Sequence, residues 1–240
     1  MPTTQKKTAA PEEAQESRAA PTLPLSYDVR IQSLRMNGSA KGNATVNLNG
    51  QFAIRGVNVM EGPNGMFVSM PSWKDSNNEY HDICFPCTKE ARSNFDKAVL
   101  SAYEQSRANG SNGQSQTQAE TLPLQYNVRI HSLRPGDGTL KGTASVNLNG
   151  QFAIRRVSII EGSKGLFVST PGFRGGNGMF KDYCFPCTKE ARSEFNQAVI
   201  DAYKQALTQS QAAGGNQTLR TEANAAFEHT AQVGAPVMQM

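Results

Sequence analysis

The chain contains an internal duplication, and this repeat constrains its fold more than any other feature of the sequence. Residues 41–103 align with residues 141–203 without a gap, and 38 of these 63 positions are identical. The match continues upstream through the pattern LPLxYxVRIxSLR, with a shift of one residue. We therefore predict two tandem copies of one small domain, at residues 23–107 and 122–207.

The segments outside the two copies are polar. Residues 1–22 and 208–240 contain too few apolar side chains to bury a core, so both are predicted to be disordered tails. Residues 108–121 are rich in Gly, Ser, Asn and Gln. A flexible linker of this kind would span roughly 20 Å and let the copies meet. Because a domain of this size is marginally stable alone, we expect the copies to pair within the chain as a pseudo-dimer.

Charge and hydropathy place the chain in a broad class. The net charge is +4, and no stretch approaches the roughly 18 apolar residues that cross a bilayer. The N-terminus also lacks the apolar run of a signal peptide. We expect a soluble, cytoplasmic protein without membrane contact.

Each copy shows strand periodicity followed by helix periodicity. Apolar residues alternate with polar ones at residues 27–31 and 44–48, which is typical of half-buried strands. Asn49-Gly50 favours a type I′ hairpin because both turn positions require positive φ. The alternation slips near Arg55-Gly56, and again at the same place in the second copy, which predicts a β-bulge.

The last part of each copy is helical in pattern. Apolar residues recur at helical spacing over residues 91–103, and Thr88 is suited to be the N-cap. The predicted fold class is α+β: a tandem repeat of a small antiparallel β-meander closed by a C-terminal amphipathic helix.

Several motifs in each copy resemble those of the SpoVG (septation protein) family. The first copy reads NGMFVSMPS, then EYHDI-x-x-P, an Arg and AVLSAY, and the second reads GLFVSTP, then MFKDY-x-x-P, an Arg and AVIDAY. The basic pair usual after MPS is Trp73-Lys74 here and Phe173-Arg174 in the second copy. The resemblance implies a small α+β fold, a dimer, and site-selective binding of DNA and RNA with roles in septation and sporulation control.

The charges that the two copies share favour the same function. Acidic residues recur at three paired positions, whereas basic residues recur at seven: Arg30/Arg129, Arg35/Arg134, Lys41/Lys141, Arg55/Arg155, Lys74/Arg174, Lys89/Lys189 and Arg92/Arg192. Phosphate contacts supply most non-specific affinity for nucleic acid, so a retained basic set indicates a polyanion-binding surface. Ordinary solubilising charge is the alternative. The second copy has eleven Lys/Arg against six Asp/Glu and is expected to bind more strongly.

Two groups of residues are the predicted nucleic-acid contacts. Lys89, Arg92, Lys189 and Arg192 fall in the first turn of the predicted helices, where backbone N–H groups already attract phosphate. The second group comprises Lys74 and Arg174, with Trp73 and Phe173 either stacking on unpaired bases or anchoring a loop.

Cysteine supplies a competing hypothesis. All four cysteines lie in two C-F-P-C motifs, at Cys84/Cys87 and Cys184/Cys187. They could form a zinc site or a redox centre if the copies pack with these segments adjacent. Because the pairs are far apart in sequence and no thioredoxin-like pattern surrounds them, packed thiols without a cofactor are the favoured interpretation.

Catalysis is poorly supported by the sequence. The copies do not share any of the three histidines, and no nucleophile triad, metal-binding His pair or phosphate-cradling Gly loop is present. We expect a non-enzymatic DNA- or RNA-binding regulator. The alternative is a protein-interaction adaptor in cell division, and further self-association of the chain stays open.

Overall fold

The computed structural model describes residues 23–109, 123–136, 138–175 and 178–230. The predicted tail at 1–22, most of the linker and the last ten residues lie outside the described residues. The first copy comprises β1 (Tyr27–Leu34), β2 (Ala40–Leu48), β3 (Phe52–Gly62), β4 (Gly65–Ser69), β5 (Ser72–Lys74), β6 (Tyr80–Asp82), β7 (Cys84–Pro86) and α1 (Lys89–Ala108). The second copy repeats this order with β8 (Tyr126–Leu133), β9 (Leu140–Leu148), β10 (Phe152–Gly162), β11 (Gly165–Ser169), β12 (Gly172–Arg174), β13 (Phe180–Asp182), β14 (Cys184–Pro186) and α2 (Lys189–Thr230).

The expected meander is confirmed in both copies. Strands β1, β2 and β3 pair antiparallel in sequence order, β4 folds back onto β3, and β8 to β11 repeat the arrangement. Asn49 and Gly50 have φ of 51° and 67°, as the predicted turn requires. The register shifts between Ile54 and Val57, which is the predicted bulge. The Thr88 side chain accepts from the backbone N–H of Ala91 and is the N-cap of α1.

Residues 80–86 form two short strands, and the second of them crosses to the other copy. β6 pairs with β5 in a separate two-stranded sheet, whereas β7 pairs with β10 of the second copy. Reciprocally, β14 pairs with β3. The exchange extends past the ladder, since the backbone N–H of Cys87 donates to Gln151 O at 2.7 Å. Each sheet therefore takes its last strand from the sibling copy, and the two copies form one intertwined pseudo-dimer.

The helices cover the apolar face of each sheet and close a core shared by both copies. Phe95 of α1 packs against Phe152 of the second copy, with ring centroids 5.9 Å apart, and Phe195 of α2 packs against Phe52 at 5.6 Å. All four rings are buried. The opposite face of each sheet carries polar and charged side chains, among them the cross-strand pairs Arg30–Thr45 and Arg129–Ser145.

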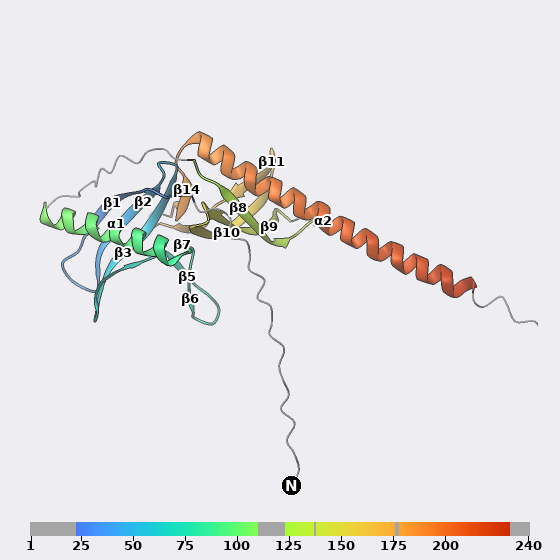
Figure 1. Ribbon diagram of the computed structural model, residues 1–240, viewed down its shortest axis with the longest axis horizontal. Coiled ribbons are helices and arrows are strands. Elements are labelled where there is room, and N and C mark those ends of the chain that lie inside the picture. Colours follow the sequence, from blue (N-terminus) through green and yellow to red (C-terminus); the bar gives the residue numbers. More distant parts are fainter. Residues whose placement is uncertain (1–22, 110–122, 137, 176–177, 231–240) are drawn as a thin grey trace, which may run out of the picture.

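The second helix differs from expectation in length. It continues to Thr230, well past residue 207, so much of the predicted tail at 208–240 is helical. In Figure 1, α2 extends beyond the strands of the second copy. None of the helices in the described part of the chain has an apolar stretch long enough to cross a membrane.

Candidate nucleic-acid interface

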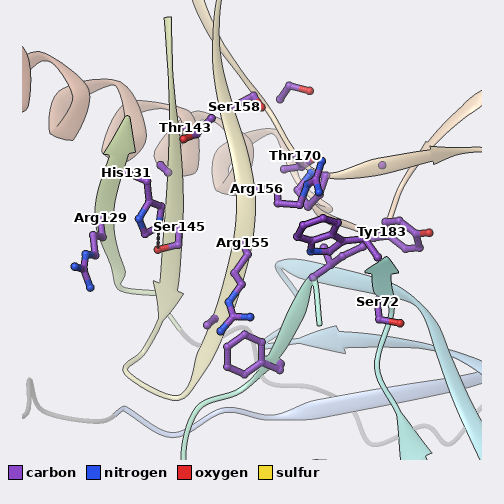
Figure 2. A pocket seen from close by; sticks show the side chains of 18 of the residues that line it. Ser72, Arg129, His131, Thr143, Ser145, Arg155, Arg156, Ser158, Thr170 and Tyr183 are labelled. Atoms are coloured by element: carbon purple, nitrogen blue, oxygen red, sulfur yellow. Dashed lines mark hydrogen bonds between the residues drawn. The ribbon is translucent and has the colours of Figure 1, made fainter. Parts of the chain in front are cut away.

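A groove of about 1190 Å³ lies on the open face of the second copy's sheet, where the first copy reaches over it. Strands β8, β9 and β10 form its floor, and residues of β5 and β7 form one wall. Its titratable nitrogen-bearing side chains are Lys74, Arg129, His131, Arg155 and Arg156, and we call this site the basic groove. Figure 2 shows Arg129, Arg155 and Arg156 on the strands that line it.

The basic groove is cationic without compensation. None of its lining residues is Asp or Glu. The remaining polar groups are mainly hydroxyls, among them Ser145, whose Oγ lies 2.9 Å from His131 Nε2. Four permanent positive charges on one concave surface, with hydroxyl donors between them, suit a phosphate backbone.

Two arginines of the second copy stack on aromatic rings of the first. Arg155 Cζ lies 4.5 Å from the centroid of the Phe85 ring, and Arg156 Cζ lies 4.2 Å from the centroid of the Trp73 ring. A guanidinium that stacks through its face keeps the N–H donors at its edge, and these are the groups that bind phosphate. The strand exchange therefore creates the groove, because it brings aromatic rings of the first copy next to arginines of the second.

The β-bulge explains why two adjacent residues both reach the groove. Consecutive side chains of a strand normally point to opposite faces, but the register of β10 shifts between Ile154 and Val157, which leaves Arg155 and Arg156 without a partner residue on β9. Both are exposed. Arg156 has a φ of 62°, a left-handed conformation that costs an L-residue about 1–2 kcal/mol. The first copy places Gly56 here, with φ of 74°, where glycine has no such cost.

The matching face of the first copy carries less positive charge. Arg30 and Arg55 correspond to Arg129 and Arg155, but Gly56 replaces Arg156. Asp28 stands where the second copy has Asn127. Burial raises the pKa of Asp28, while the charge of nearby Arg30 opposes that rise. The second copy thus offers the more basic face, in the direction that the sequence counts predicted.

The structure divides the predicted contact residues among separate surfaces. Trp73 and Lys74 line the basic groove, whereas Arg174 lies outside its lining, on the strand beside Phe180. Lys89 and Arg92 line a different, shallower depression of about 590 Å³ at the start of α1, which shares no residue with the groove. Lys189 and Arg192 are exposed at the start of α2.

Arg92 and Phe173, two of the predicted residues, are held by contacts within their own copies. Arg92 donates to Asp96 Oδ2 at 2.9 Å and to the Val68 carbonyl at 2.6 Å, so it ties the helix to β4. The Phe173 ring stacks on Tyr183 at 4.6 Å. These contacts favour a structural role for both side chains, with Phe173 as a loop anchor.

Sequence reasoning missed Arg156, one of the exposed cations of the groove. Arg129 and Arg155 belong to the basic pairs shared by both copies, so that signal found them without identifying them as contacts. Arg156 has no basic counterpart, and a search for shared charge passes over it. His131 is likewise unmatched, since Gln32 occupies its position in the first copy.

The four cysteines separate into two kinds. Cys84 and Cys184 are fully buried and contact each other at the junction of the copies. Burial raises the pKa of Cys184 well above its usual value, and Cys84 adds to the rise. Cys87 and Cys187 are exposed and accept hydrogen bonds from Asn147 and Asn47 at 3.4 and 3.5 Å.

A shared cation site does not form from these sulfurs in the described part of the chain. The one group of metal-type ligands that gathers there is Asp75, Glu79 and His81, whose ligand atoms lie within 4.8 Å of one another. The second copy has Gly175, Met179 and Lys181 at these positions. The Cys₄ alternative thus finds no common set of ligand atoms among the described residues, and the interpretation of the cysteines as packed thiols stays a prediction.

Thiol reactivity should follow this division. We expect two thiols per native chain, Cys87 and Cys187, to react with a disulfide reagent, and all four to react after denaturation. The Cys87 and Cys187 side chains reach solvent, but neighbouring protein atoms exclude part of the water around each sulfur. This desolvation raises the pKa of both thiols. The thiolate is then scarce at neutral pH, and the rate should rise about tenfold per pH unit up to at least pH 9. Fast reaction of four native thiols would contradict the placement of Cys84 and Cys184.

Comparison with known proteins agrees with the repeat. A family model described as SpoVG matches residues 26–105 and again 125–205. A putative septation protein SpoVG of Caldanaerobacter subterraneus subsp. tengcongensis is 36% identical over 85 residues, which is 35% of this chain and 93% of that protein. The namesake of Symbiobacterium thermophilum is 40% identical over 116 residues, 47% of this chain and 76% of that protein. A putative septation protein SpoVG of Archaeoglobus fulgidus is 38% identical over 78 residues, which is 32% of this chain and 92% of that protein.

Proposed function

Because this chain belongs to the SpoVG family and carries two tandem copies of the family domain, we propose that it is a non-enzymatic cytoplasmic regulator that binds DNA or RNA. The similar proteins are named as septation proteins, so we place the regulated process in septum formation or its timing. The single observation that carries the binding proposal is the basic groove, in which four permanent cations line one concave surface without a carboxylate.

The electrostatics support a polyanion over a small acidic ligand. The groove spans three strands, and its three arginines are spread along it instead of converging on one point. Each phosphate neutralised by an arginine or lysine releases condensed counterions, which adds affinity for a polymer but not for an isolated phosphate. The hydroxyls between the cations can accept or donate to phosphate and sugar oxygens without demanding a particular base.

Binding should therefore depend steeply on salt. With four phosphate contacts the affinity for a single strand falls with a log–log slope of about −3, or roughly 50-fold between 50 and 200 mM salt. Fluorescence polarisation with short labelled DNA and RNA, single-stranded and duplex, measures this slope.

Two outcomes would contradict the proposal. Absence of binding to every probe at 50 mM salt would favour the alternative of a protein-interaction adaptor. Binding that is insensitive to salt would place the contact outside the basic groove.

A further inference from the structure

A chain of side-chain contacts runs from the first copy into the basic groove. Asp75 Oδ2 lies 2.9 Å from His81 Nε2, and the His81 ring packs against the Trp73 ring with centroids 5.2 Å apart. Trp73 in turn carries the guanidinium of Arg156, which belongs to the second copy. Asp75 is itself fixed, because Oδ1 accepts from the backbone N–H groups of Asn77 and Glu79.

The pseudo-symmetric position has none of these groups. Gly175 replaces Asp75, Lys181 replaces His81 and Phe173 replaces Trp73, while Gly56 replaces Arg156. The first copy keeps the two floor arginines, as Arg30 and Arg55, so it retains these cations but lacks the contact chain. Four residues that contact one another in series thus differ together between two equivalent positions. This indicates that the contact chain acts on one side of the pseudo-dimer only.

The backbone conformation of Arg156 also indicates a functional role for this residue. Its left-handed conformation favours glycine, and the sibling copy has glycine there. A strained residue persists where the surrounding structure holds it, and such residues concentrate at functional sites. Here the Trp73 ring contacts the Arg156 side chain, which lines the groove, and His81, held by Asp75, packs against the Trp73 ring.

We propose that Arg156 determines where nucleic acid binds, and that Trp73 and His81 are positioning residues acting through it. Each chain then has one preferred site and takes up one nucleic-acid segment, although its fold is two-fold repeated. This inference rests on the proposed function and deepens it, since a symmetric pair of copies would offer two equal sites.

The test uses the sibling residue as the substitution. Arg156→Gly reproduces the first copy at a backbone position that already suits glycine, so the variant is expected to fold with a melting temperature at or above that of the wild type. Its affinity for a labelled single-stranded oligonucleotide should fall about fivefold or more at 50 mM salt, and the salt slope should decrease by about 0.7. Trp73→Phe should weaken binding less, and its effect should disappear in the Arg156→Gly background because it acts through that residue.

The reverse substitution, Gly56→Arg in the first copy, tests whether a second nucleic-acid site can be created. The atoms nearest to an added Cβ at Gly56 belong to Tyr183 and Pro71, at 3.6 and 3.7 Å, which is ordinary contact. The φ of 74° at Gly56 would strain an arginine as the φ of 62° strains Arg156, so Gly56→Arg should lower stability by about 1–2 kcal/mol and still fold. It should raise the stoichiometry of oligonucleotide bound per chain above one. Wild-type protein should titrate at one.

The outcomes separate this inference from the proposed function. If Arg156→Gly binds as wild type while Arg155→Ala is weakened, Arg156 has no special role and the inference fails, but the groove still binds. A wild-type stoichiometry of two equal sites would also overturn it. If wild type binds no probe at low salt, the proposed function itself is wrong.

Discussion

Replacing Phe152 with alanine is expected to lower the free energy of unfolding by about 3–5 kcal/mol and to destabilise both copies together. The ring is fully buried in the second copy and packs against Phe95 of the first. Phe152 also lies in register with Pro86, the end of the strand that crosses from the first copy. The cavity left by truncation would therefore open at the junction of the copies and not within one of them.

Two probes of one denaturation curve measure this coupling. The single tryptophan, Trp73, lies in the first copy and reports on it by fluorescence, while far-UV circular dichroism reports on the whole chain. Both transitions should shift together in Phe152→Ala. Phe167→Ala is the matched control, because that ring is 46% exposed and its removal should cost under about 1 kcal/mol. A fluorescence transition that stays at its wild-type position would show that the copies fold independently.

The local structure could be predicted from the sequence because it depends on near neighbours. Positive φ at Asn49-Gly50, the bulge near Gly56 and the Thr88 cap all follow from residue types within a few positions of one another. The duplication then confirmed each signal by repeating it. The α+β meander with a closing helix needed no long-range information beyond this.

The strand exchange could not be predicted in the same way. A three-residue strand such as β7 carries too little periodicity to show which sheet edge it joins, and its partner Ile154 lies 70 positions away from Cys84. Consequently the sequence could not show that Phe85 contacts Arg155 and that Trp73 contacts Arg156. These are the contacts that form the basic groove.

Only part of the candidate site could be predicted. The charges that both copies share are an incomplete guide to the residues that form it. The shared set included Arg129 and Arg155, but it also included Arg92, which pairs with Asp96 four residues later. That i,i+4 acid was visible in the sequence and provides a structural reason for the arginine. Arg156 was missed because Gly56 stands at its position in the first copy, and because its contact with the Trp73 ring depends on the strand exchange.

Substitution of both floor arginines should remove most of the binding. Arg129→Ala/Arg155→Ala takes away two of the four permanent charges of the basic groove, from β8 and from the bulge of β10. At roughly 1 kcal/mol for each phosphate contact the affinity should fall about 30-fold at 50 mM salt. The salt slope should decrease by about 1.4 in magnitude, since two fewer counterions are released. Fluorescence polarisation across a salt series measures both quantities, and an unchanged slope would show that neither arginine contacts phosphate.

Binding through the basic groove is tested most directly by comparing this variant with its sibling, Arg30→Ala/Arg55→Ala, which removes the same two residues from the first copy. The two variants have the same net charge, so any general effect of charge on affinity is equal for both. We expect the dissociation constant of Arg129→Ala/Arg155→Ala to exceed that of Arg30→Ala/Arg55→Ala by about tenfold or more at 50 mM salt. Equal losses in the two variants, or a larger loss in Arg30→Ala/Arg55→Ala, would contradict the assignment of the second copy's groove as the nucleic-acid site.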